Sequence, residues 1–173
     1  MNKEYEEEIR NWKILSYDQL PDFDLYIDQL IHVVDQQMLP LKMVPSNTEI
    51  TASMVNNYVK HDLLPPPKKK RYGKKHLAIL IVISFLKSVF SIGEIKKGIE
   101  MTLENREYGL AYDEFCLFVE NGIKKYLLGE GMELETDNKA LYYACESLAS
   151  KLFVQNHLEN EHRGKVEKER TDG

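Results

Sequence analysis

The sequence lacks most of the features on which catalytic and metal sites are built. It has only two cysteines, Cys116 and Cys145, which form no CxxC pair and have no pair of histidines nearby, so we expect no metal. Nor does it contain a glycine-rich phosphate loop or a nucleophile with an adjacent base. We therefore expect no catalytic residues, no cofactor and no enzymatic activity.

Long apolar runs are also missing. The longest one, Leu77 to Leu86, is interrupted by Ser84 and flanked by lysines, and it is shorter than the roughly 18 residues that a membrane helix needs. The N-terminus shows no charged and then apolar signal pattern. Together with the scarcity of cysteine, these absences favour a cytoplasmic protein without a membrane partner, in which Leu77 to Leu86 is a buried helix.

Charge is distributed unevenly along the chain. The net charge is -5, but residues 51–100 carry ten Lys or Arg against three Asp or Glu, so that this segment is at +7 and the remainder at -12. Such a basic segment would orient a negative polymer such as double-stranded DNA onto one part of the molecule, although acidic helices also serve solubility alone. With 43% apolar residues, the 173-residue chain can form a compact core.

The basic segment begins with a short polar helix, predicted over 52–61 with Thr51 as a good N-cap. One face of it is apolar and consists of Met54, Val55, Tyr58 and Val59. The opposite face is rich in amides and consists of Ser53, Asn56, Asn57 and Lys60. Asparagine can pair with two base-edge atoms of adenine at once, so this face suits the major groove of DNA. A solvated face of a small helix is the alternative.

A proline turn and a basic loop follow this helix. Pro65, Pro66 and Pro67 hold the chain extended. The cations that come next surround an aromatic residue and a glycine, in the order Lys68, Lys69, Lys70, Arg71, Tyr72, Gly73, Lys74 and Lys75. Such a loop can lie along phosphates as a wing and release their counterions. Charge alone would equally suit a solvated loop, but the position directly after an amide-bearing helix favours the wing.

The remaining periodicity predicts helices and almost no strand. An apolar stripe over 23–39 predicts a helix before the amide-bearing one, and Pro40 and Pro45 interrupt the connection between the two. Ser91 with Glu94 is a capping-box pattern. Further helices are predicted over 2–12, 76–90, 92–104, 112–128 and 138–153. We therefore predict a predominantly all-α fold, a winged helix-turn-helix head with a C-terminal helical body and at most a small β wing.

This pattern divides the chain into four segments. They are an acidic N-terminal segment 1–20, a winged helix-turn-helix DNA-binding domain 21–105, a C-terminal helical region 106–158 and a charged tail 159–173 that we expect to be disordered. The apolar stripes of the helices 112–128 and 138–153 would form either a homodimer interface or part of the internal core.

Residues 48–100 resemble the DNA-binding head of MerR-type regulators. The resemblance rests on T-x-x-x-V-x-x-Y, H-D-L-L-P-P, a basic loop ending in R-Y, and S-I-G-E-I-K. It implies that the matching family positions are Tyr58 in the recognition helix, Leu63, Leu64 and Pro65 in the turn, Arg71 and Tyr72 at the end of the wing, and Ile92, Glu94 and Ile95 in a later helix. The chain departs from that family in its long segment Asp22 to Leu39, and in having Asn56 and Asn57 near a position where arginine is common.

More narrowly, the chain is similar to a poorly characterised bacterial family of YkrK-like DNA-binding proteins, otherwise described as a domain of unknown function. The similarity rests on D-L-Y-I-D-Q-L at Asp24 to Leu30 and on I-T-A-S-M-V-N-N-Y-V-K at Ile50 to Lys60. It implies a DNA-binding role and specifies neither a regulated gene nor an effector.

These patterns together predict a sequence-specific transcriptional regulator that binds double-stranded DNA. The predicted DNA-binding residues are Thr51, Ser53, Asn56, Asn57, Lys60, Lys68, Lys69, Lys70, Arg71, Tyr72, Lys74 and Lys75. A protein-interaction module with the same fold and an architectural DNA-binding protein are the alternatives. A small-molecule sensor would instead line a pocket with aromatic residues of the last helices, namely Phe115, Tyr126, Tyr142 and Tyr143.

Overall fold

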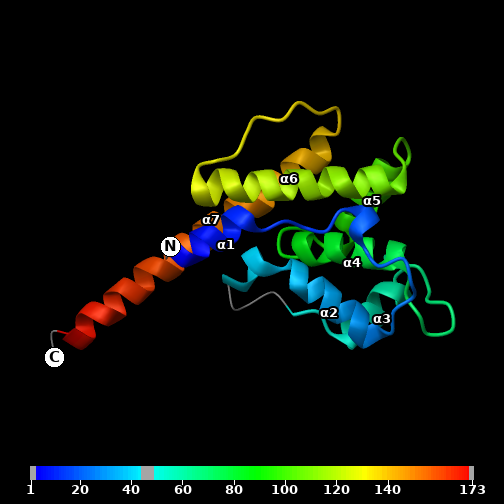
Figure 1. Ribbon diagram of the computed structural model, residues 1–173, viewed down its shortest axis with the longest axis horizontal. Helices are drawn as coiled ribbons and strands as arrows, with labels where there is room; N and C mark the ends of the chain where they lie inside the picture. The colour runs from blue at the N-terminus through cyan, green and yellow to red at the C-terminus, as the bar shows by residue number, and fades with distance from the viewer. Residues whose placement is uncertain (1–2, 44–48, 172–173) are drawn as a thin grey trace.

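Helices make up most of the part of the chain that the computed structural model describes, which is residues 3–43 and 49–171 (Figure 1). They are α1 (Lys3–Asn11), α2 (Ile27–Gln37), α3 (Ala52–Lys60), α4 (Lys74–Leu86), α5 (Ile92–Leu103), α6 (Tyr108–Leu128) and α7 (Lys139–Thr171), with 3-10 turns η1 (Tyr17–Gln19) and η2 (Leu39–Met43). Within these ranges there is no strand, only the isolated bridges Leu25–Tyr72 and Lys68–Arg71. The prediction of an all-α fold with at most a small wing is confirmed. The connection predicted around Pro45 lies outside the described residues.

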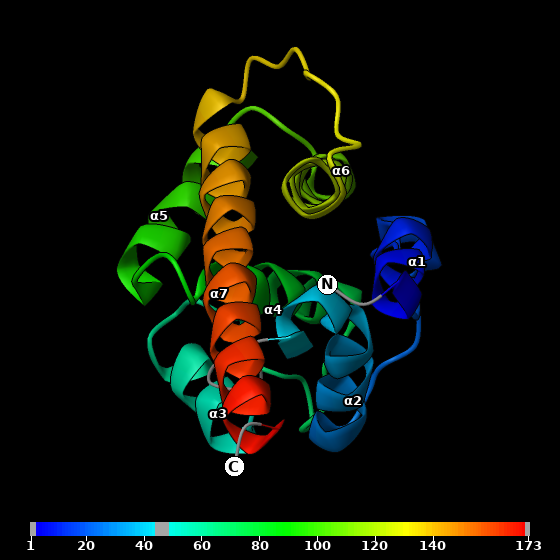
Figure 2. The ribbon, with the colours of Figure 1, turned by 90° about the vertical axis from the view of Figure 1, so that its left-hand side faces the viewer.

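Helix α4 forms the centre of the fold. Nine of its thirteen residues are buried, because the helix is apolar on all sides and packs against α2, α5, α6 and α7. Figure 1 shows α6 on one side of α4 and α2 with α3 on the other, and Figure 2 shows α7 running along the body past α4. The buried polar residue of α4, Ser84, is satisfied within the helix, since its hydroxyl donates a 2.6 Å hydrogen bond to the Leu80 carbonyl. None of the described helices combines the length and apolar character that crossing a bilayer requires.

Helices α6 and α7 use their apolar stripes against each other and the core. Phe115, Val119 and Ile123 of α6 are buried in the same cluster as Cys145 and Leu148 of α7. Gly129 ends α6 in the left-handed conformation at φ 71°, which glycine adopts without a steric penalty. The stripes over 112–128 and 138–153 are therefore part of the internal core, one of the two roles expected for them.

Helix α7 continues to Thr171 and projects beyond the body at its C-terminal end (Figure 1). It thus includes most of the segment 159–173, for which composition predicts disorder. The difference has a local reason, since this stretch has no proline and is rich in the good helix formers Glu, Lys and Arg.

The N-terminal segment packs into the body. Ile9 and Trp12 are buried, and the Trp12 indole donates a 3.1 Å hydrogen bond to the Gln37 carbonyl at the end of α2. The Ile14 amide donates to a Glu120 carboxylate oxygen of α6 at 2.8 Å. The segment therefore connects α2 with α6, which its glutamate-rich composition does not indicate.

Candidate nucleic-acid interface

Helix α3 presents the amide-bearing face to solvent, as its periodicity predicts. Val55 and Tyr58 are buried and Met54 and Val59 are half-buried. The opposite face is exposed and consists of Ser53, Asn56, Asn57 and Lys60. The helix begins at the predicted cap, because Thr51 Oγ1 accepts a 3.2 Å hydrogen bond from the Met54 amide.

The end of α3 is fixed by a left-handed residue rather than by the prolines. Asp62 has φ 56°, and the amides of Leu63 and Leu64 both donate to the Tyr58 carbonyl at 2.9 and 3.1 Å. Leu63 and Leu64 are buried, which attaches the turn to the core. The chain thus turns at Asp62, three residues before the proline run Pro65 to Pro67, and Pro65 and Pro66 lie exposed.

The basic loop is a minimal hairpin. Lys68 and Arg71 exchange two backbone hydrogen bonds of 3.1 and 2.9 Å. The two residues between them, Lys69 and Lys70, have φ 50° and 61°, as in a type I′ turn. Glycine and asparagine are favoured at these positions, and a left-handed backbone costs other residues roughly 1 kcal/mol or more each. Two lysines therefore occupy the tip of the loop against their backbone preference.

The base of the hairpin is tied to the segment before α2. The amide and carbonyl of Tyr72 pair with those of Leu25 at 2.9 and 2.8 Å, and the Gly73 amide donates to His76 Nδ1 at 3.0 Å. The Tyr72 ring is only 4% exposed, and burial raises the pKa of its hydroxyl. Tyr72 therefore holds the base of the loop from the core, and its side chain does not lie on the surface where the sequence predicts a DNA contact.

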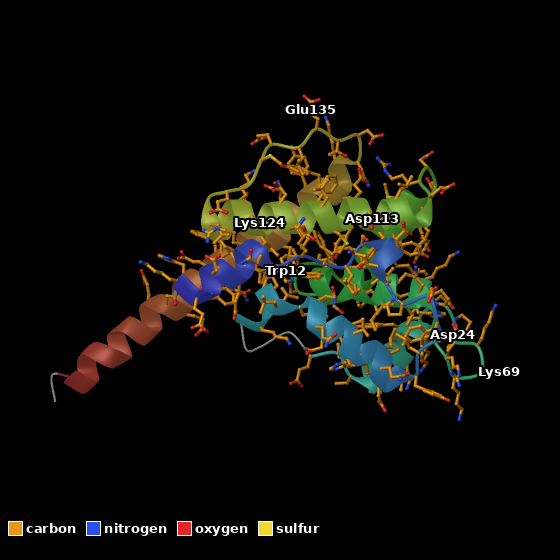
Figure 3. The ribbon with its side chains drawn as sticks, in the orientation of Figure 1. Trp12, Asp24, Lys69, Asp113, Lys124 and Glu135 are labelled. Atoms are coloured by element: carbon orange, nitrogen blue, oxygen red, sulfur yellow. The ribbon has the colours of Figure 1, made fainter. Side chains whose placement is uncertain are left out.

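The other cations of the loop are exposed. Figure 3 shows Lys69 at the outer end of the loop, and Figure 1 shows the loop at the end of the molecule opposite the C-terminus. Within residues 3–42 and 49–161, whose side chains the structure describes, neither Lys60 nor any of the loop cations Lys68 to Arg71 forms an ion pair with a carboxylate. The salt bridges lie elsewhere, at residues such as Arg10, Lys42 and Arg106. Their charge is thus available to an external anion.

Lys74 and Lys75 differ from the loop cations. Each follows the hairpin in the first turn of α4, and the Lys74 ammonium lies 5.3 Å from the centroid of the Tyr17 ring. The Lys75 ammonium lies 5.4 Å from that of Tyr108. Because these rings belong to η1 and α6, the two lysines lie beside the body, where Lys74 is half-buried and Lys75 is exposed.

Two exposed aromatic side chains near the loop are not among the residues that the sequence predicts to bind DNA. The helix predicted over 23–39 includes Tyr26, but α2 starts only at Ile27 and Tyr26 is 52% exposed. Its ring lies under the Arg71 guanidinium, with 4.4 Å between Cζ and the ring centroid. Phe23 is 64% exposed. Pro21 and Asp22 mark a break in the sequence, but no local pattern distinguishes these exposed rings from core residues.

Comparison with known proteins identifies a family and no function. Residues 15–115 match the family described as Domain of unknown function (DUF1836), and this range includes α3, the basic hairpin, α4 and α5. No curated protein and no solved structure matches the chain. Since the match covers more than half of its residues, the chain belongs to the DUF1836 family.

Proposed function

We propose that this protein is a sequence-specific DNA-binding transcriptional regulator of the winged helix-turn-helix type. In this proposal the exposed face of α3 enters the major groove while the hairpin lies on the adjacent phosphates. The observation that carries it is the tip of the hairpin, where Lys69 and Lys70 hold a left-handed backbone that disfavours lysine. A turn selected for folding alone would favour asparagine and glycine there. Binding of phosphates by both ammonium groups would explain why lysine occupies these two positions.

The chemistry of α3 supports the reading of bases as well as phosphates. Asn56 and Asn57 are adjacent and exposed on one face with Ser53, and an asparagine side chain donates to and accepts from adenine through its two amide atoms. The cations of the hairpin supply the sequence-independent part of the affinity. The proposed contact residues are Thr51, Ser53, Asn56, Asn57, Lys60, Lys68, Lys69, Lys70 and Arg71, all of which are exposed.

Fluorescence anisotropy of the purified protein against native genomic fragments and a scrambled pool, over a salt series, tests this function. We expect tight binding to a few native fragments at physiological salt and weak binding to the scrambled pool. Equal and steeply salt-dependent binding to both pools would point to an architectural protein. Absence of binding at low salt would contradict any DNA-binding function and favour a protein-interaction module whose hairpin contacts an acidic partner.

We further propose that the protein binds DNA as a homodimer, because two half-sites multiply the limited specificity of one short helix. The inner stripes of α6 and α7 are used in the core, so the dimer surface would be the outer part of α7. Its exposed apolar side chains are Phe153, Val154 and Leu158. Analytical ultracentrifugation tests the dimer: we expect Val154→Glu with Leu158→Glu to sediment as a monomer, and a monomeric wild type at high concentration would contradict it.

A further inference from the structure

A cavity of about 750 Å³ lies between α5 and the helices α4, α6 and α7. Helix α5 covers it loosely, because only Ile95 of its twelve residues is fully buried. Cavities of roughly 300 to 1,000 Å³ are typical of sites for small organic molecules. The cavity lies away from the hairpin, and the proposed DNA contacts do not use it.

The walls of the cavity are apolar. Each of the four helices contributes aliphatic or aromatic side chains, represented by Val82, Leu86, Ile99, Phe115, Leu141 and Ala144. Such walls suit an alkyl chain, whose transfer from water is favourable in proportion to the apolar area that it buries. A polar metabolite would find few partners there.

Charged side chains gather at one part of the lining, near the start of α7. Arg106 Nε lies 3.0 Å from a carboxylate oxygen of Glu114, and its Nη2 contacts Asp137. Glu114 is firmly held, because Thr136 and Asn138 also donate to it at 3.2 and 3.1 Å. The Asp137 side chain is 87% exposed, so water competes strongly for it. Arg106 therefore has one fixed carboxylate partner and one exchangeable partner.

Lys139 adds a second cation to this part of the lining. It is exposed, and in the described residues it forms no ion pair. Besides Asp137, the lining has one other carboxylate, that of Glu94, which already accepts from the Ser91 amide and hydroxyl at 2.8 and 2.7 Å. An anionic group that entered here would thus find Lys139 unpaired and could replace Asp137 on Arg106.

We propose that the cavity binds an apolar carboxylic acid of the medium-chain fatty acid class, with its alkyl chain between α5 and α7 and its carboxylate on Arg106 and Lys139. In this arrangement the ligand carboxylate takes the place of the Asp137 side chain. An alcohol of the same chain length would fill the apolar part of the cavity without this charge pairing.

Isothermal titration calorimetry with decanoate and with 1-decanol, each below its solubility limit, tests the site. We expect decanoate to bind more tightly than the alcohol. Lys139→Gln should weaken decanoate about fivefold, as expected for loss of one partly exposed charge pair, and leave 1-decanol unchanged. Asp137→Asn should strengthen decanoate, because it removes the competing carboxylate. Equal binding of acid and alcohol, or the same response of both ligands to Lys139→Gln, would overturn the proposal.

Filling the cavity provides the second test. Ala144 lines the cavity from α7 and is half-buried, so Ala144→Phe should occupy the space and abolish binding of both ligands. Leu117→Phe places the same ring at an exposed position of α6 outside the lining and serves as the matched control, with binding retained. Thermal denaturation shows that each variant is folded. Retained decanoate binding by folded Ala144→Phe would place the ligand elsewhere, and since no DNA is used the result is independent of the proposed function.

Discussion

The guanidinium of Arg71 lies 4.4 Å from the centroid of the Tyr26 ring and also donates a 2.8 Å hydrogen bond from Nη2 to the Tyr26 hydroxyl. Arg71 closes the basic hairpin, while Tyr26 immediately precedes α2. The contact therefore restrains Arg71, the last cation of the hairpin, by attaching it to the residue that precedes α2. It also leaves the other donors of a five-donor guanidinium for a phosphate.

We expect Tyr26→Ala to weaken binding to all DNA sequences by about two- to fivefold, because Arg71 loses a cation–π contact of roughly 0.5–1 kcal/mol. Tyr26→Phe keeps the ring and loses only the hydroxyl, so its affinity should lie between those of Tyr26→Ala and the wild type. Fluorescence anisotropy at fixed salt measures both. If Tyr26→Ala changed the preferred sequence instead of the overall affinity, Tyr26 would be a base contact.

Replacing Asn56 and Asn57 by Ala should relax sequence preference. Each lost bidentate contact costs about 1 to 3 kcal/mol on the preferred site, whereas binding to scrambled DNA should change little. Competition between preferred and scrambled duplexes measures the ratio. Because both side chains are exposed, thermal stability should stay near that of the wild type. An equal loss on both duplexes would contradict a base-reading role for this face.

The turn Lys69–Lys70 should show a trade between stability and binding. Lys69→Asn with Lys70→Gly suits the left-handed backbone, so we expect the free energy of unfolding to rise by about 1 kcal/mol. Loss of two phosphate contacts should lower the slope of log K against log salt by about 1.8 for B-DNA.

Urea denaturation and salt-dependent anisotropy measure these two effects. Lys96→Gln with Lys97→Gln removes the same charge from α5 and is the matched control, with a much smaller change of slope. An unchanged slope in the turn variant would show that the tip of the hairpin does not contact phosphates.

Both thiols should resist alkylation in the folded protein. Burial raises the pKa of Cys116 to about 12 and raises that of Cys145 well above its usual value, so thiolate is scarce at pH 8 in addition to being inaccessible. A thiol-reactive chromophore should label neither residue in buffer and both in denaturant. Rapid labelling of the native protein would show that α6 and α7 separate readily.

Local chemistry explains what the sequence could predict. The exposed face of α3 follows from the apolar period of Val55 and Tyr58 and from the Thr51 cap, and the Ser91–Glu94 capping box forms as expected, with the Ser91 amide donating to Glu94 at 2.8 Å. Each of these features depends only on residues within one or two helical turns. The position of the basic hairpin likewise follows from its cations and the preceding prolines.

Other features depend on pairing between distant segments. Tyr72 is buried because its backbone pairs with Leu25, and no property of the basic run around it indicates that. Tyr26 is exposed because it lies one residue before the start of α2 and is not part of the apolar face of that helix. The conformation of Lys69 and Lys70 contradicts the residue preference, so propensity could not have found it. The cavity arises from the spacing of four helices and has no signal in any one of them.

Phe85 shows how much of the chain is needed to fold the family region. This fully buried side chain of α4 contacts Phe115 of α6 and Trp12, with ring centroids 6.0 and 6.1 Å apart. The matched region 15–115 begins after Trp12 and ends at Phe115, partway through α6. A fragment cut to those limits would expose the parts of α4 that Trp12, the rest of α6 and α7 now cover, and would be prone to aggregate. The region that matches the family is thus shorter than the region that packs around α4. The part of the chain that we propose to bind DNA should therefore be prepared together with its flanking helices.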